Sequence, residues 1–162
     1  MWFYDIVHLG RYIMENEPRP KSILICDDEP DILEMMSNLF KSKGYAVETA
    51  TGHEEFFAKF ERNRPDLILL DIRIPDRDGF SIADELQQRE NRAPIIFVTA
   101  HNRSIYRLCS PVAGAVDFIV KPFDPDVLLA SVKKALKSDA SGSNWFLYAT
   151  CRKSQLAEQS TE

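Results

Sequence analysis

Two kinds of segment alternate along the chain from Lys21 onward. Short apolar runs rich in β-branched residues predict five strands, at "SILIC" (22–26), "YAVETA" (45–50), "DLILLD" (66–71), "PIIFVTA" (94–100) and "AVDFIV" (115–120). The runs "ILIC" and "LILL" are apolar throughout, which is typical of central strands covered on both faces. "YAVETA" alternates between apolar and polar residues, which favours an edge strand.

The longer stretches between the strands have helical spacing. The segment "PDILEMMSNLFKSKG" (30–44) ends at a glycine suited to a helix C-terminus, and its apolar face comprises Ile32, Leu33, Met36, Leu39 and Phe40. Residues 52–63, 78–90 and 124–138 show the same periodicity. Strands alternating with helices predict an α/β fold, and a doubly wound, five-stranded parallel sheet is its simplest closure. A further helix is expected between Thr99 and Gly114, shortened or kinked near Ser110 because Pro111 follows.

The segments outside the alternating region differ from it. We expect a domain over residues 21–138, an N-terminal extension with helical spacing over 1–20, and a C-terminal linker and tail over 139–162. Both extensions contain aromatic residues, in "MWFY" and "NWFLY", and are expected to pack on this domain. A homodimer formed through an N-terminal helix is the alternative.

Composition narrows the class of protein. A net charge of −5 and a pI of about 5.3 argue against direct binding of nucleic acid by this chain. The three cysteines form no CxxC pair and leave one thiol over from any disulfide, as in a reducing compartment. No segment has the pattern of a signal peptide or a membrane span. We therefore expect a cytoplasmic protein, with Cys26 as a small buried hydrophobe.

Polar residues follow the predicted strands at one edge of the sheet. In an open parallel sheet, ligands bind outside the carboxyl ends of the strands. The residues expected there are Asp27 and Asp28, Asp71, Thr99 and Ala100, and Lys121 and Pro122. Neighbouring carboxylates repel each other, and oxygen ligands without His or Cys suit Mg²⁺. An aspartate can form an acyl phosphate, a lysine can pair with phosphate, and a threonine can donate its hydroxyl. The set indicates a phosphoryl-transfer site.

Each of these residues also has a purely structural interpretation. Asp71 can end a strand before a turn, and Asp28 can cap the helix that follows. Thr99 can be an ordinary strand residue, and Lys121 a solvated surface lysine. Taken singly, these alternatives stay open, but their coincidence at one edge favours a site.

The motifs resemble those of response regulator receiver domains in two-component signalling. The resemblance covers about residues 21–138 and rests on "ILICDDEPDIL", "PDLILLDIRIPDRDGF", "PIIFVTA" and "GAVDFIVKPF", with the combination of DxxxPxxDG and KPF as its most specific part. It implies a flavodoxin-like fold with strand order 2-1-3-4-5. It also implies Mg²⁺ as cofactor, and as partners a histidine kinase or histidine phosphotransfer protein and a downstream target protein.

The resemblance also implies a role for each site residue. Asp71 is the expected phosphoacceptor, and Asp27, Asp28, Asp71 and the backbone carbonyl of Arg73 the expected Mg²⁺ ligands. The phosphate-contacting and switch residues are Thr99, Ala100, Lys121 and Phe118, and the Lys121–Pro122 bond is expected to be cis. Arg73 and His101 occupy positions that tune phosphate lifetime in the family, whereas His8 and His53 are expected at the surface.

Three further expectations concern activity and output. The chain is not expected to be an enzyme, because its output is a changed binding surface. Residues after 138 are too few for a DNA-binding module, so output through protein contact is expected unless the chain is part of a longer regulator. One alternative is a receiver fold that acts as a constitutive interaction module without phosphorylation. A haloacid-dehalogenase-type phosphatase is the other, although Arg73 stands where those enzymes have a second acid.

Overall fold

Five strands and four helices make up the described structure, a computed structural model that covers residues 19–100 and 115–137. In chain order they are β1 (Ser22–Cys26), α2 (Pro30–Ser42), β2 (Ala46–Ala50), α3 (His53–Asn63), β3 (Leu67–Leu70), α4 (Gly79–Gln88), β4 (Ile95–Thr99), β5 (Ala115–Val120) and α6 (Pro125–Lys137). The predictions for both extensions and for the helix that contains Pro111 lie outside the described residues.

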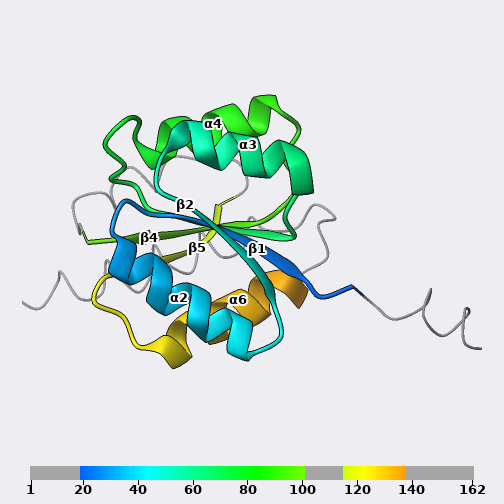
Figure 1. The fold of residues 1–162 in the computed structure, drawn as a ribbon, viewed down its shortest axis with the longest axis vertical. Coiled ribbons are helices and arrows are strands. Elements are labelled where there is room, and N and C mark those ends of the chain that lie inside the picture. The colour runs from blue at the N-terminus through cyan, green and yellow to red at the C-terminus, as the bar shows by residue number, and fades with distance from the viewer. Residues whose placement is uncertain (1–18, 101–114, 138–162) are drawn as a thin grey trace, which may run out of the picture.

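The strands form one parallel sheet with the order β2-β1-β3-β4-β5. Helices α3 and α4 cover one face of this sheet and helices α2 and α6 cover the other (Figure 1). The doubly wound arrangement and the strand order are those predicted, and β2 is an edge strand as its alternating pattern indicated. No helix in the described ranges is long and apolar enough to cross a membrane.

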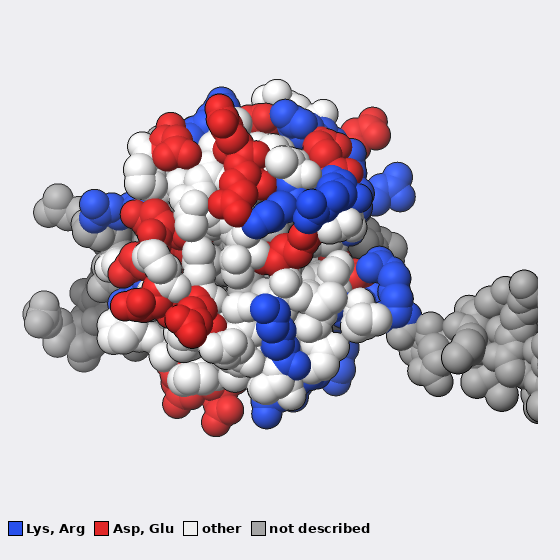
Figure 2. Space-filling model, in the orientation of Figure 1, with Lys and Arg blue, Asp and Glu red and all other residues white. Residues whose placement is uncertain are grey.

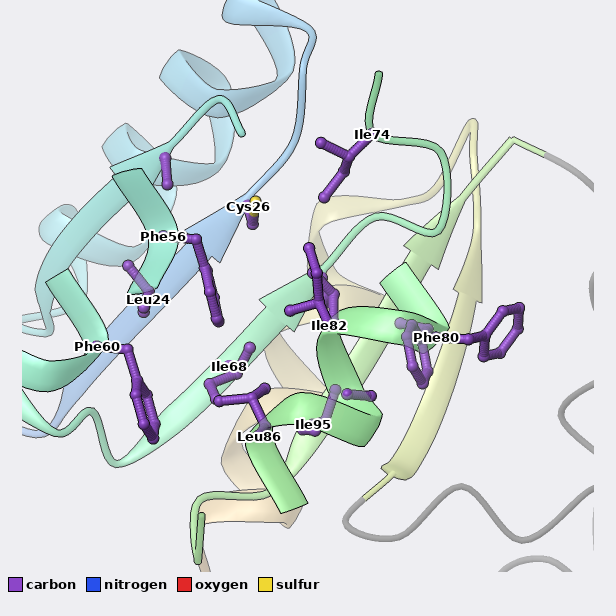
Figure 3. Close-up of a cluster of buried hydrophobic side chains, with 14 of the residues drawn as sticks. Leu24, Cys26, Phe56, Phe60, Ile68, Ile74, Phe80, Ile82, Leu86 and Ile95 are labelled. Carbon is purple, nitrogen blue, oxygen red and sulfur yellow. The ribbon is translucent and has the colours of Figure 1, made fainter. Parts of the chain in front are cut away.

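The core consists of two apolar clusters, one on each face of the sheet. Leu24 and Cys26 of β1 point into the cluster beneath α3 and α4, whereas Ile23 and Ile25 point into the cluster beneath α2 and α6. Figure 3 shows the first cluster, in which the rings of Phe56 and Phe60 stack with centroids 6.3 Å apart. Because successive side chains of a strand point to opposite faces, a strand buried on both faces must be apolar throughout. This explains the runs "ILIC" and "LILL".

Three local features correct or extend the sequence interpretation. Helix α2 has Glu29, not Asp28, at its N-cap, so the interpretation of Asp28 as a helix cap is wrong. Gly44, beyond the end of α2, has a φ of 86°, a left-handed conformation that glycine adopts without steric cost. Burial and the neighbouring Asp27 raise the pKa of the Cys26 thiol far above its ordinary value, so Cys26 stays protonated in the core.

Candidate functional site

The carboxyl ends of the parallel strands bring four predicted site residues to one edge. Asp27 follows β1, Asp71 follows β3, Thr99 is the last residue of β4, and Lys121 follows β5. Asp27 and Asp71 are only 0% and 4% exposed, and Thr99 is also buried. Asp28 is exposed, and one carboxylate oxygen from each of the three aspartates lies within 4.8 Å of the other two. The acidic cluster predicted from the sequence is therefore present.

The ammonium of Lys121 lies at the centre of this cluster. Its Nζ is 2.6 Å from Asp27 Oδ2, 2.8 Å from Asp71 Oδ2 and 2.9 Å from Glu29 Oε1. The Lys121 side chain is 8% exposed, which excludes the interpretation of a solvated surface lysine. Burial alone lowers the pKa of Lys121, but the carboxylates of Asp27, Asp71 and Glu29 around the ammonium outweigh it and raise this pKa above its ordinary value. Lys121 is thus held as a buried cation.

Asp27 is the most deeply buried acid of the site. Burial raises the pKa of its carboxyl, and the neighbouring Lys121 ammonium and a hydrogen bond from the Glu29 backbone N–H oppose that shift. Although Asp27 Oδ2 is close to Lys121 Nζ, it has no hydrogen bond of good geometry among the described residues. A buried acceptor in this condition is suited to a further cation.

The donor set fits Mg²⁺, because three carboxylates without His or Cys are the hard oxygen ligands that this ion takes. Asp27, Asp28 and Asp71 are the side chains that would hold it. The Arg73 backbone N–H donates to Asp71 Oδ1 at 2.9 Å, which fixes the orientation of the Asp71 carboxylate; the Arg73 carbonyl as a further ligand stays a prediction. A bound Mg²⁺ supplies positive charge that offsets the repulsion between the carboxylates.

The residues predicted to respond to phosphorylation lie on β5 and at the carboxyl end of β4. The Thr99 carbonyl accepts a hydrogen bond from the Lys121 backbone N–H at 2.8 Å, which joins the ends of these two strands. Ala100 is exposed, and Phe118 is half-buried against the cluster beneath α3 and α4. The Lys121–Pro122 peptide bond is cis. The switch roles of Thr99, Ala100 and Phe118 stay predictions, and His101 lies outside the described residues.

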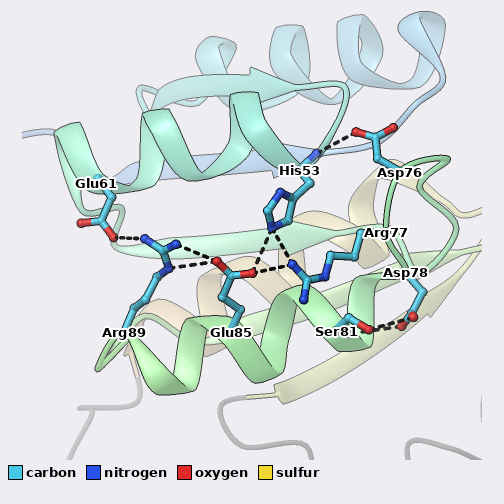
Figure 4. A network of polar contacts seen from close by, with 8 residues as sticks. All are labelled: His53, Glu61, Asp76, Arg77, Asp78, Ser81, Glu85 and Arg89. Carbon is cyan, nitrogen blue, oxygen red and sulfur yellow. Dashed lines mark hydrogen bonds and ion pairs between the residues drawn. The ribbon is translucent and has the colours of Figure 1, made fainter.

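The loop after Asp71 is tied to α3 and α4 by polar contacts that the sequence did not reveal (Figure 4). Asp76 Oδ2 accepts a hydrogen bond from the His53 backbone N–H at 3.2 Å. Arg77 Nη1 donates to Glu85 Oε2 at 2.9 Å, and His53 Nε2 lies at the same distance from that oxygen. His53 is therefore a half-buried link between the helices, not merely a surface residue. These contacts support the backbone that carries Asp71 and Arg73.

Ion pairs continue this network across α3 and α4. Arg89 lies 2.9 Å from Glu61 and 2.6 Å from Glu85, and its guanidinium stacks over the ring of Phe57. Figure 2 shows acidic and basic side chains intermixed on this face of the molecule, consistent with such pairs. Such pairs link the two helices, and an exposed ion pair contributes about 1 kcal/mol or less to stability.

Gly79, at the start of α4, explains the glycine of the DxxxPxxDG motif. A Cβ atom at this position would overlap the backbone carbonyl oxygen of Asp71 and lie 2.9 Å from Ile72 Cα. The Gly79 N–H also donates to the Ile72 carbonyl at 2.8 Å. Only glycine lets the chain return this closely behind the candidate phosphoacceptor.

One participant in the site was missed by the sequence interpretation, namely Glu29. Its contact with Lys121 joins residues 92 positions apart, so no local pattern could reveal the pair. The one indication in the sequence was that Glu29 directly follows the predicted site residues Asp27 and Asp28.

Comparisons with known proteins agree with this geometry. Residues 23–133 match the family model described as "Response regulator receiver domain". The alkaline phosphatase synthesis transcriptional regulatory protein PhoP of Bacillus subtilis is 36% identical over 117 residues, which is 72% of this chain and 49% of that protein. The regulatory protein AtoC of Escherichia coli is 35% identical over 115 residues, 71% of this chain and 25% of that protein. The chain thus spans half or less of the length of these curated relatives.

Solved structures show the same similarity. A CheY-like receiver domain protein from Methanospirillum hungatei superposes with a TM-score of 0.67 and 33% identity, covering 72% of this chain and 94% of that one. The response regulator TrrA of Thermotoga maritima, in complex with Mg²⁺ and BeF, superposes with a TM-score of 0.65 and 36% identity, covering 71% of this chain and 98% of that one. On the evidence of its motifs, fold, acidic site and these matches, the chain belongs to the family of response regulator receiver domains.

Proposed function

We propose that this chain is a phosphoacceptor in a two-component phosphorelay. Asp71 accepts a phosphoryl group from the phosphohistidine of a histidine kinase or histidine phosphotransfer protein, in the presence of Mg²⁺. The observation that carries the proposal is the environment of Asp71. Its carboxylate is buried at the end of β3, 2.8 Å from the Lys121 ammonium and clustered with Asp27 and Asp28.

The transfer exchanges one phosphorus bond for another. A carboxylate oxygen of Asp71 forms a bond to phosphorus while the bond from phosphorus to the donor atom breaks, and the donor leaves with that electron pair. Lys121 offsets negative charge at the reacting group, and Asp27 and Asp28 would hold the metal ion. Because the groups around the Asp71 carboxylate are fixed charges, they promote phosphoryl transfer by positioning the reacting groups and neutralising their charge.

The output of this reaction is a change of shape. Phosphorylation adds about −1.5 to −2 charges at Asp71, which shifts an equilibrium between two arrangements of the domain. Thr99 is proposed to follow the phosphoryl group and Phe118 to move into the core, which alters the surface offered to a downstream protein. In this role the chain is a signalling acceptor of the cytoplasm and not an enzyme with its own outside substrate.

Intact-mass measurement tests the proposal directly. The protein is incubated with Mg²⁺ and acetyl phosphate, which releases acetate as the phosphoryl group is transferred. We expect a gain of one phosphoryl mass in the wild type and in the control Asp84→Asn, an exposed acid on α4. No gain is expected in Asp71→Asn or when EDTA removes Mg²⁺.

Phosphohistidine transfer distinguishes the alternatives. If the folded wild type takes no phosphoryl group from acetyl phosphate or from a phosphorylated histidine phosphotransfer protein, the proposed function is wrong. A constitutive interaction module then explains the fold better. Continuous hydrolysis of a generic phosphomonoester would instead indicate a phosphatase.

A further inference from the structure

Three carboxylates surround the Lys121 ammonium, which donates hydrogen bonds to Asp71 and Glu29 and forms an ion pair with Asp27. An ammonium carries three N–H donors, and Asp27, Asp71 and Glu29 each place an oxygen within 2.9 Å of Nζ. Phosphorylation moves the negative charge of Asp71 onto the phosphoryl group, which then competes for the Lys121 ammonium with the two carboxylates that stay charged, Asp27 and Glu29. The structure therefore raises the question of which carboxylate is displaced.

Burial separates the three partners. The side chains of Asp27 and Asp71 are 1% and 5% exposed, and each accepts a hydrogen bond from a backbone N–H that holds it in place. The Glu29 side chain is 57% exposed, and its described polar contact is the one with Lys121. An ion pair with one solvated partner is weak, because water competes for the carboxylate. Glu29 is thus the partner that leaves most easily.

The position of Glu29 on its helix points the same way. Glu29 is the N-cap residue of α2, yet its side chain makes no capping hydrogen bond. Its backbone meets the needs of the local fold, because the N–H donates to Asp27 Oδ1 at 3.0 Å and the carbonyl accepts from the Leu33 N–H at 3.1 Å. The side chain contributes little to α2 and instead reaches across the strand ends to Lys121.

We propose that Glu29 is a positioning residue that holds Lys121 before phosphorylation and competes with the incoming phosphoryl group for its outward donor. The inference rests on the proposed function. In the resting domain the Glu29 carboxylate keeps the ammonium paired. When an anionic phosphoryl group arrives at Asp71, it replaces Glu29, which turns into solvent. The strength of the Glu29–Lys121 pair then sets part of the affinity of the site for a phosphoryl group.

Binding of beryllofluoride, a phosphoryl mimic, tests this without relying on turnover. Its affinity at saturating Mg²⁺ is measured by calorimetry for the wild type, Glu29→Gln and the control Asp31→Asn. The control removes the same charge from an exposed acid in the first turn of α2. Glu29→Gln is expected to bind beryllofluoride about two- to fivefold more tightly than the wild type, the worth of an exposed ion pair. Asp31→Asn is expected to change much less.

Affinity for Mg²⁺ alone provides a second readout, which is not expected to increase. Because Glu29→Gln removes a negative charge near the aspartates, its affinity for Mg²⁺ is expected to be equal to or weaker than that of the wild type. A general loosening of the site would lower the affinity for both ligands. Tighter binding of beryllofluoride without tighter binding of Mg²⁺ is therefore specific to the proposed competition.

The outcomes separate the inference from the function on which it rests. If the wild type binds beryllofluoride but Glu29→Gln binds it no more tightly, or Asp31→Asn tightens binding equally, the inference about Glu29 is wrong and the proposed function stands. If the wild type binds no beryllofluoride with Mg²⁺ present, both are overturned.

Discussion

Removal of the Lys121 ammonium is expected to destabilise the domain strongly. In Lys121→Met the aliphatic length of the side chain is roughly kept, but the buried carboxylates of Asp27 and Asp71 lose the cation between them. Loss of one partner from a buried pair leaves an uncompensated charge in a poorly hydrated place. The substitution therefore tests whether Lys121 is the structural counter-ion of the site.

The magnitude follows from the two distances. At an effective dielectric of about 20, charges at the observed 2.6–2.8 Å attract by about 6 kcal/mol per pair. Desolvation of the ammonium offsets several kcal/mol of this attraction, and broken buried pairs cost about 3–5 kcal/mol in measured cases. We expect a loss of this size in the free energy of unfolding without Mg²⁺. This loss is a large fraction of the total free energy of unfolding, which is about 5–15 kcal/mol for a typical domain.

Urea unfolding in EDTA and in Mg²⁺ measures this effect. Lys21→Met is the control, because Lys21 is 58% exposed in its pair with Asp66 and should contribute about 1 kcal/mol or less. Mg²⁺ at 100 times its Kd stabilises a protein by about 2.7 kcal/mol. The tighter binding expected at the more negative cluster makes the gain larger in Lys121→Met than in the wild type at equal Mg²⁺. If Lys121→Met loses no more stability than Lys21→Met, the view of Lys121 as counter-ion is refuted.

Three further predictions concern the supporting structure. Gly79→Ala should lower the free energy of unfolding, measured with urea, by about 1–3 kcal/mol because the new Cβ overlaps the Asp71 backbone. Gly52→Ala should lower it less because the Asp76 side chain can rotate away from the new Cβ. Equal losses in the two variants would contradict this prediction. Burial raises the pKa of Asp66, but hydrogen bonds led by that from the Ser22 backbone N–H outweigh it, so its folded pKa lies below the ordinary 3.8. The stabilisation by ionised Asp66 is thus present above about pH 4 and is lost as the pH falls through the folded pKa. Asp66→Asn should therefore have a lower free energy of unfolding than the wild type near pH 7, and this difference should narrow near pH 3. A difference that stays constant with pH would contradict the prediction. Phe56→Ala, at a fully buried position, should lower the free energy of unfolding by about 3–5 kcal/mol, and a cost below about 1 kcal/mol would show that the cluster is loosely packed.

The local sequence pattern predicts most of the secondary structure. Apolar runs such as "LILL" locate buried strands, and the 3.6-residue period locates helices such as α2, because side-chain direction follows from backbone geometry alone. Asp27, Asp71 and Lys121 follow three predicted strands. A parallel sheet necessarily brings such residues to one edge, so the core of the candidate site was predictable. The strand order came from family resemblance, since adjacency in the sheet is not a local property.

Only the tertiary structure decided which side chains meet. The Glu29–Lys121 pair and the link from His53 to Glu85 join distant segments, and both depend on the spacing of elements in three dimensions. The same limit explains why the sequence left open a helix cap at Asp28 as an alternative to its predicted role as a metal ligand, whereas the N-cap of α2 is Glu29. Periodicity reports the direction of a side chain from its own backbone, whereas a contact depends on where a second backbone lies. The sequence by itself therefore determined the elements and the acidic edge, and the packing of those elements determined the partners of each charge.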